Sequence, residues 1–103
     1  MAQIAVFRNG TKISECQLDP SKEYTIGRGS QCDIILDHLE ISRQQAKLIF
    51  NNETQNWECR GLSKFGKMSV NGYPVEHISL SPGAKFLISS FELRFEEVLD
   101  DKT

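Results

Sequence analysis

Hydrophobic and polar residues alternate in short runs along most of the chain, and turn-forming residues interrupt these runs roughly every 8–12 residues. The clearest case is the last run, in which three apolar residues alternate strictly with charged residues over positions 91–96. A period of two places apolar side chains on one face of a strand and polar side chains on the other. No segment shows a sustained helical stripe. The pattern therefore predicts an all-β protein.

The same reading gives the approximate positions of the strands. A turn at residues 81–83 and a strand at 85–88 precede the last strand, and the two strands together form a hairpin. Further strands are predicted at residues 12–18, 23–28, 32–36, 43–50 and 57–62. About ten short strands in so little chain indicate a two-sheet antiparallel β-sandwich.

Two features qualify this picture. Residues 41–49 fit either a helix or a strand, because they contain good helix formers while Ala46, Leu48 and Phe50 alternate. Asn-Gly pairs occur at positions 9–10 and 71–72, each between strand-like runs. This pair readily adopts the positive φ angles of a tight type I′ turn, so Asn71 and Gly72 are predicted to have a structural role.

Length and composition limit the class of protein. The 103 residues suffice for one small domain, which we expect to cover residues 1–98 and to be followed by the start of an acidic linker or tail at 99–103. A formal net charge of −2 gives no global positive field, so direct nucleic-acid binding is not expected. No secretory signal and no apolar run of about 20 residues is present, and we expect no membrane association.

The cysteines, histidines and motifs of the sequence indicate neither a metal site nor a catalytic centre. The three cysteines are an odd number without Cys-x-x-Cys spacing, which favours reduced, half-buried thiols in the cytosol or nucleus. His38 and His77 add no metal-ligand spacing, so we expect neither metal nor cofactor. No nucleophile elbow or phosphate-binding glycine loop occurs, and the chain is not predicted to be an enzyme.

The residues that could bind a ligand lie at the ends of predicted strands. Arg28 closes a strand on the same face as Tyr24 and Ile26, so its guanidinium must leave the core and find an anion. The simplest partner is a surface carboxylate, Asp33 or Asp37. If Arg28 instead converged with other strand-end residues, the group would form a good phosphate receptor. Those other residues are Ser42, Arg43, Lys64 and Lys67.

Periodicity alone leaves this convergence open. Counting strands up and down places Arg28 at one end of a sandwich, and Ser42 and the loop around Lys64 at the other. The exception would be a segment 32–36 too short to run the length of a sheet.

Three motifs, in order and spacing, carry a resemblance to a known family. They are Gly27-Arg28, then the run Ile41-Ser42-Arg43-Gln44-Gln45-Ala46, then Val70-Asn71-Gly72. Together they resemble the forkhead-associated (FHA) domain, a β-sandwich that reads phosphothreonine peptides. The resemblance runs from about Tyr24 to Val98, with the two N-terminal strands fitting the expected architecture. FHA domains recognise phosphorylated motifs through arginine clusters.

The resemblance assigns roles to individual residues. It implies that Arg28 binds the phosphate, that the Ser42 hydroxyl bonds to it, and that Arg43 contacts phosphate or peptide backbone. The binding loops of the family gather at one end of the sandwich, which supplies the convergence. The full set of phosphopeptide-binding residues that we expect is Arg28, Ser42, Arg43, Gln44, Lys64, Gly66 and Lys67.

Two positions depart from the family pattern. Gln45 stands where the family usually has a histidine that braces the loops, and glutamine replaces some of its hydrogen bonds but not its ring packing. Gly66 stands where the family usually has an asparagine that holds the main chain of the ligand. Losing one such bond costs on the order of 1 kcal/mol, which weakens binding without abolishing it.

The expected partner is a protein or peptide that contains phosphothreonine. The FHA resemblance implies nuclear signalling, such as the DNA damage response, with a cytoplasmic location as the alternative. A second function is kept open, namely a phosphate-independent interaction or homodimerisation domain with a degenerate phosphate site. Gln45 and Gly66 motivate this alternative, as do Phe65 and Met68 if they are exposed apolar contacts, although core packing is the simpler role for Met68.

Overall fold

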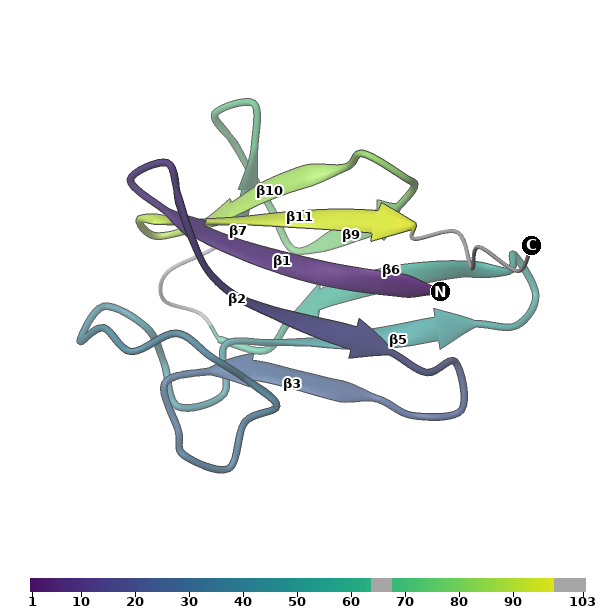
Figure 1. Ribbon diagram of the computed structural model, residues 1–103, viewed down its shortest axis with the longest axis horizontal. Coiled ribbons are helices and arrows are strands. Elements are labelled where there is room, and N and C mark those ends of the chain that lie inside the picture. The colour runs from purple at the N-terminus through teal and green to yellow at the C-terminus, as the bar shows by residue number, and fades with distance from the viewer. Residues whose placement is uncertain (64–67, 98–103) are drawn as a thin grey trace, which may run out of the picture.

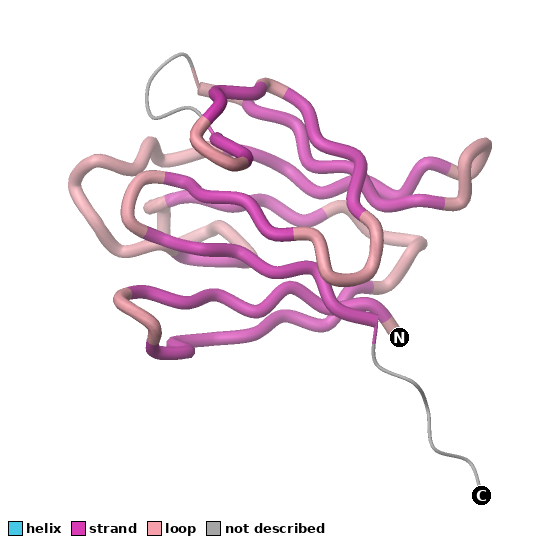
Figure 2. The backbone as a smooth tube through the Cα atoms, turned by 90° about the horizontal axis from the view of Figure 1, so that it is seen from above, coloured by secondary structure: helices cyan, strands magenta, loops and turns pink. Residues whose placement is uncertain are grey.

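The computed structural model describes residues 1–63 and 68–97. Regular structure in these residues is entirely β, and Figure 2 shows strands and connections without a helix in this part of the chain. The strands are β1 (Ala2–Arg8), β2 (Thr11–Leu18), β3 (Tyr24–Gly27), β4 (Ile34–Ile35), β5 (Ala46–Asn51), β6 (Asn56–Gly61), β7 (Met68–Val70), β8 (Tyr73–Val75), β9 (His77–Leu80), β10 (Lys85–Ile88) and β11 (Phe91–Glu97). No helix of the described residues is long and apolar enough to cross a membrane.

The strands form two sheets (Figure 1). One sheet has six strands in the order β2-β1-β11-β10-β7-β8, and the other has five in the order β4-β3-β5-β6-β9. The predicted β-sandwich is confirmed, and β10 and β11 form the expected antiparallel pair. The pairing is antiparallel with one exception, because β3 and β4 run parallel, with Ile26 opposite Ile34 and Gly27 opposite Ile35.

The ambiguous segment 41–49 is resolved in favour of a strand, which begins at Ala46. β5 lies between β3 and β6 and pairs with both, so its backbone groups are satisfied by two ladders. That pairing, together with the burial of Ala46 and Leu48, outweighs the helix propensity of the flanking glutamines and Lys47.

The core lies between the sheets and follows the alternation in the sequence. Along β11, Phe91, Leu93 and Phe95 are buried while the charged residues between them are only partly covered. Met68 is buried as well, with its sulfur 3.5 Å from Cys59 Sγ, so it is a core residue rather than an exposed contact. All three cysteines are free, and burial raises the pKa of Cys59 to about 12.

The two Asn-Gly pairs adopt the predicted conformation. Asn71 and Gly72 join β7 to β8 with φ angles of 52° and 85°, and Asn9 and Gly10 join β1 to β2 with 53° and 78°. Asparagine and glycine tolerate this left-handed region better than other residues, which is why a two-residue hairpin forms at each place. Asn71 and Gly72 thus form the two-residue turn between β7 and β8.

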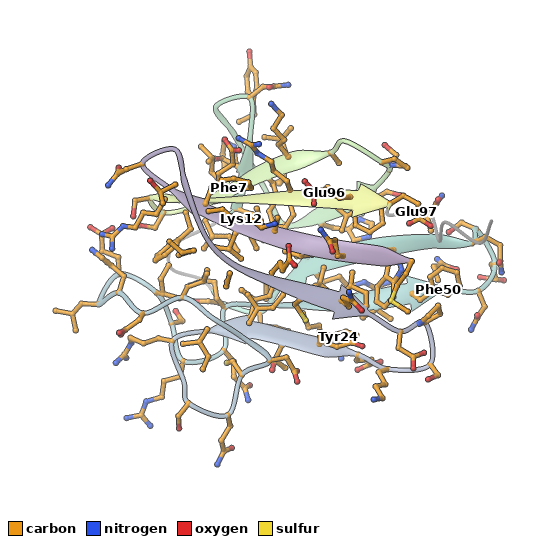
Figure 3. All side chains as sticks on the ribbon, in the orientation of Figure 1. Phe7, Lys12, Tyr24, Phe50, Glu96 and Glu97 are labelled. Carbon is orange, nitrogen blue, oxygen red and sulfur yellow. The ribbon has the colours of Figure 1, made fainter. Side chains whose placement is uncertain are left out.

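The two ends of the sandwich differ. At the end that we call the loop end, the connections after β3 and before β5 lie on the same side as the β1–β2 and β10–β11 turns (Figure 1, left). At the opposite end, which holds the N-terminus, the sheets leave a groove of about 850 Å³. We call this the groove end. Figure 3 shows Tyr24, Phe50 and Glu97, three of the groove residues, in that half of the molecule.

Candidate phosphate-binding site

Arg28 is the first residue after β3, and its side chain is exposed. Its backbone N–H donates to the carbonyl of Ser42 at 2.9 Å, and its Nε donates to the carbonyl of Ile41, also at 2.9 Å. The side chain is therefore fixed through Nε, which leaves the two terminal nitrogens to face a ligand. Within the described residues, no carboxylate lies at ion-pair distance from this guanidinium.

The predicted alternative, an ion pair between Arg28 and Asp33 or Asp37, is therefore not formed in the described part of the chain. Asp33 instead accepts hydrogen bonds from Thr25, at 2.9 Å from the backbone N–H and 3.2 Å from the hydroxyl. The carboxylate of Asp33 is thus bonded to β3 on the side that faces β4, whereas Ser42 precedes β5 on the other side of β3.

Ser42 reaches Arg28 because β4 is only two residues long. The connection after Gly27 turns back, so that β4 runs parallel to β3, and Leu36 N–H donates to the carbonyl of Gly27 at 2.9 Å. The chain thus stays at the loop end instead of crossing the sheet. This is the exception that strand counting had left open, and it brings Arg28 and Ser42 together.

Gly27 makes this approach sterically feasible. A Cβ at this position would lie 2.2 Å from the carbonyl oxygen of Arg43, closer than real side chains allow. Gly29 N–H donates to the same oxygen at 3.2 Å. The two glycines on either side of Arg28 therefore allow the segment 27–29 to lie directly against residues 42 and 43.

A buried glutamine ties the loop segments to one another. Gln45, which is 1% exposed, accepts a hydrogen bond from the Ser42 backbone N–H at its Oε1 (2.9 Å). Its own backbone N–H donates to Ile26 at 2.7 Å, and its carbonyl accepts from Leu62 N–H at 2.9 Å. One residue thus joins the end of β3, the segment before β5 and the segment after β6. The side-chain amide supplies the loop-bracing bond expected at this position.

Ser63 is a candidate site residue that the sequence analysis did not identify. Its hydroxyl lies 2.6 Å from the hydroxyl of Ser42, so two hydroxyls stand beside the Arg28 backbone contact. The position of Ser63 follows from the register of the β5–β6 hairpin. Phe50 pairs with Trp57 and Ala46 with Gly61, and continuing this register places Ser63 opposite Gln44, two residues from Ser42.

The other predicted residues fall into two groups. Arg43 and Gln44 are exposed at the loop end, and the carbonyl of Arg43 is held by Gly29 N–H and, at 3.0 Å, by Cys32 Sγ. Lys64, Gly66 and Lys67 lie outside the described residues. The structure therefore brings Arg28, Ser42, Arg43 and Gln44 to one end, and adds Ser63.

The chemistry of this end suits an anion. It offers two exposed arginines, two hydroxyls and backbone segments fixed by hydrogen bonds. The nearby carboxylate of Glu40 is engaged by the Ser89 hydroxyl at 2.5 Å and lies 3.9 Å from His38 Nδ1. In the described ranges, no group of three or more histidine, cysteine or acidic residues could hold a metal ion.

A family model for the FHA domain matches residues 24–89, which is more than half of the chain. The protein therefore belongs to the FHA domain family. The match contains Arg28, Ser42 and the Asn71-Gly72 turn. No curated protein sequence matches the chain.

Solved structures share this fold. The FHA domain of the CT664 protein from Chlamydia trachomatis is 24% identical, with a TM-score of 0.81 over 95% of this chain and 98% of that one. The FhaA FHA domain, solved in complex with the intracellular domain of Rv3910, is 20% identical, with a TM-score of 0.78 over 93% of this chain and all of the other. A third, from a study of phosphothreonine-dependent FHA domain interactions, is 18% identical, with a TM-score of 0.79 over 95% and 97% of the two chains.

Proposed function

We propose that this domain is a phosphothreonine-dependent protein-interaction module that binds phosphorylated peptides at its loop end. The observation that carries the proposal is the meeting of Arg28 with the hydroxyl pair of Ser42 and Ser63, on segments tied together by backbone hydrogen bonds. Membership of the FHA family supports it, because FHA domains recognise phosphorylated motifs through arginine clusters. Related structures include Mycobacterium tuberculosis EmbR in complex with a low-affinity phosphopeptide.

The proposed mechanism assigns each group a part. The terminal nitrogens of Arg28 donate to two phosphate oxygens, in the planar fork geometry that suits this ligand. The Ser42 and Ser63 hydroxyls donate to the phosphate in place of the bond that they share in the free protein. Arg43 adds positive charge at the rim. Because a phosphothreonine carries about −1.5 to −2 charges, an unphosphorylated threonine leaves these donors without a matching acceptor.

The preformed geometry reduces the cost of binding. Arg28 is already held through its Nε, and Gln45 fixes the backbone of Ser42, so few side chains must be ordered when a peptide arrives. Lys64, Gly66 and Lys67 are assigned to a loop that flanks the bound peptide, where the two lysines add positive charge. We further propose that the protein acts in nuclear signalling such as the DNA damage response, which imaging of the tagged protein in cells would test.

The experiment that tests the proposed function begins with an oriented phosphothreonine peptide library screened against the purified domain. The selected peptide is then titrated in phosphorylated and unphosphorylated forms against the wild type and against Arg28→Ala. We expect the unphosphorylated form and the Arg28→Ala variant to bind at least tenfold more weakly, the consequence of losing one or more charge-assisted hydrogen bonds.

Two outcomes would overturn the proposal. Equal affinity for the two peptide forms would show that phosphate is not recognised, and tight binding by Arg28→Ala would show that Arg28 is not the ligand. If no phosphopeptide binds while the molecular mass rises with protein concentration, the phosphate-independent homodimerisation alternative is favoured. The unfolding temperature of the variant serves as the control, because Arg28 is exposed and its side chain makes one hydrogen bond to the described part of the chain.

A further inference from the structure

Arg8 ends strand β1 at the loop end, on the face of the strand that points into the sandwich. The residues that share this face, Ala2, Ile4 and Val6, are buried in the core. Arg8 is half-buried, and its guanidinium carbon lies 5.2 Å from the centre of the Phe91 ring, on the neighbouring strand β11. A charged side chain thus occupies a position that the strand pattern would assign to an apolar one.

The Nε of Arg8 has no partner. It is sealed from solvent, and it is the single side-chain nitrogen or oxygen in the described residues that is buried without a hydrogen bond. No carboxylate of the described part of the chain lies at ion-pair distance from this arginine. Since a guanidinium that is partly removed from water is stabilised by a paired anion, the terminal nitrogens of this half-buried arginine are open to an anion supplied by a ligand.

Arg94 provides an internal comparison. Its guanidinium also lies over a phenylalanine, 3.9 Å from the centre of the Phe7 ring, but on the outer face of the same sheet. There it forms an ion pair with Glu92 through Nε. Two arginines are therefore packed on aromatic rings of adjacent strands, and one has its counter-ion while the other does not. Contact with an aromatic ring alone does not account for the unpaired state of Arg8.

A continuous series of contacts connects Arg8 to the phosphate site. Its ring partner Phe91 follows the turn at Ser89, where φ is 54°. The Ser89 hydroxyl donates to Glu40 and so joins this turn to the segment before β5. The next residue, Ile41, accepts the Nε bond of Arg28. The end of β1, which carries Arg8, and the end of β3, which Arg28 follows, therefore lie at the same end of the sandwich (Figure 1).

We propose that Arg8 is a second anion-binding position, which contacts an acidic group of the peptide whose phosphothreonine lies on Arg28. The inference rests on the proposed function and adds the kind of ligand, a peptide with two anionic groups. Because Nε is sealed, the terminal nitrogens of Arg8 make the contact, in the bidentate geometry of arginine with carboxylate or phosphate. The carboxylate of Glu40 accepts a hydrogen bond from the Ser89 hydroxyl and forms no ion pair with Arg8, so it does not take the place of the ligand.

The test uses the best phosphothreonine peptide and a series in which a second phosphate, or an aspartate, is moved one residue at a time along both sides of it. We expect one position at which the second anion raises the affinity about tenfold, the value of one good charge-assisted contact. A gain from both groups identifies any acidic side chain as the ligand, and a gain from phosphate alone identifies a second phosphorylated residue.

Two variants distinguish Arg8 from general electrostatics. Arg8→Met keeps an apolar side chain over Phe91 but removes the charge, and the ratio of affinities for the doubly and singly anionic peptides should fall to about one. Arg94→Met, the matched control, should leave this ratio unchanged. If no position gives a gain, or if Arg8→Met retains it, the second anion site does not exist, while phosphate-dependent binding of the single-site peptide would leave the proposed function in place.

A second readout does not depend on how well Arg8→Met folds. The guanidinium N–H resonance of Arg8 in the wild-type protein should shift on titration with the doubly anionic peptide, and hardly at all with the singly phosphorylated one. Equal shifts with both peptides, or none, would contradict a direct contact. If neither peptide binds in any form, the proposed function fails and the inference that rests on it fails too.

Discussion

The loop end and the groove end of this sandwich differ in the contacts that hold their segments together. At the groove end, Trp57 packs against Tyr24 and Phe50, with ring centres 6.0 and 5.5 Å away. At the loop end, backbone hydrogen bonds hold the segments, as between Arg28 N–H and Ser42, and the exposed side chains include Arg28, Arg43 and Gln44 as well as the apolar Leu39 and Leu62.

This difference separates stability from binding. Aromatic side chains at the groove end bury large apolar areas and so contribute strongly to the free energy of unfolding. Exposed arginines and hydroxyls at the loop end contribute little to stability but offer donors to a ligand. Substitutions at the two ends should therefore have effects of different kinds.

The largest effect on stability is expected at the groove end. Trp57→Ala removes a side chain that is 3% exposed and should lower the free energy of unfolding by about 4 kcal/mol. Urea unfolding measures this loss. Where the variant remains folded, its affinity for the phosphopeptide should match the wild type, and a large loss of affinity would show that the two ends are coupled.

Gly27→Ala should damage the loop end itself. Its Cβ would lie 2.2 Å from the carbonyl oxygen of Arg43, so the segment carrying Ser42 must move, at a cost of about 3 kcal/mol. Affinity should fall together with stability in the same titrations. The matched control is Gly10→Ala, whose Cβ meets nothing within 4 Å and whose positive φ should cost only about 1 kcal/mol. Equal effects of the two changes would argue against the close approach.

A smaller effect is expected from the hydroxyl pair. Ser42→Ala or Ser63→Ala should each weaken phosphopeptide binding severalfold, by about 1 kcal/mol, with little change in stability. The double variant should lose less than the sum, because the two hydroxyls share one ligand. Calorimetric titration gives these values, with Ser79→Ala on the exposed side of β9 as the control. Strict additivity would mean that the hydroxyls act independently.

The smallest effect concerns the pH dependence of stability at Glu58, which follows Trp57 on β6. The Asn51 amide and then His77 donate hydrogen bonds to Glu58, which lowers the pKa of this carboxyl below its ordinary value of 4.5. A pKa that is lower in the folded state adds stability above the unfolded pKa, and this stability is lost as the pH falls through the folded pKa. Glu58→Gln should therefore lessen the drop in urea midpoint between pH 7 and about pH 3, whereas Glu53→Gln should leave it unchanged.

Much of the fold could be predicted from the sequence, because alternation determines which face of a strand is buried. The alternation of apolar and polar residues predicted the β-sandwich, and the two Asn-Gly pairs predicted the turns of two hairpins. The parallel pairing of β4 could not be predicted, since nothing in a period of two shows that the chain turns back after Gly27.

The site was predictable in part. Arg28 and Ser42 were found from their motifs, but strand counting placed them at opposite ends, and a two-residue strand is too short to leave a pattern. Ser63 was open to prediction from the register of the β5–β6 hairpin. Arg8 was not, because a sequence does not show whether a charged residue on an inner face has a partner.

The most direct test of the account is a titration of the isotope-labelled domain with its best phosphopeptide, followed by amide chemical shifts. Binding at the loop end predicts shifts that centre on Arg28, Ser42 and Ser63 and leave Trp57 and Phe50 unchanged. Shifts centred on the groove residues instead would contradict the assignment of binding to the loop end.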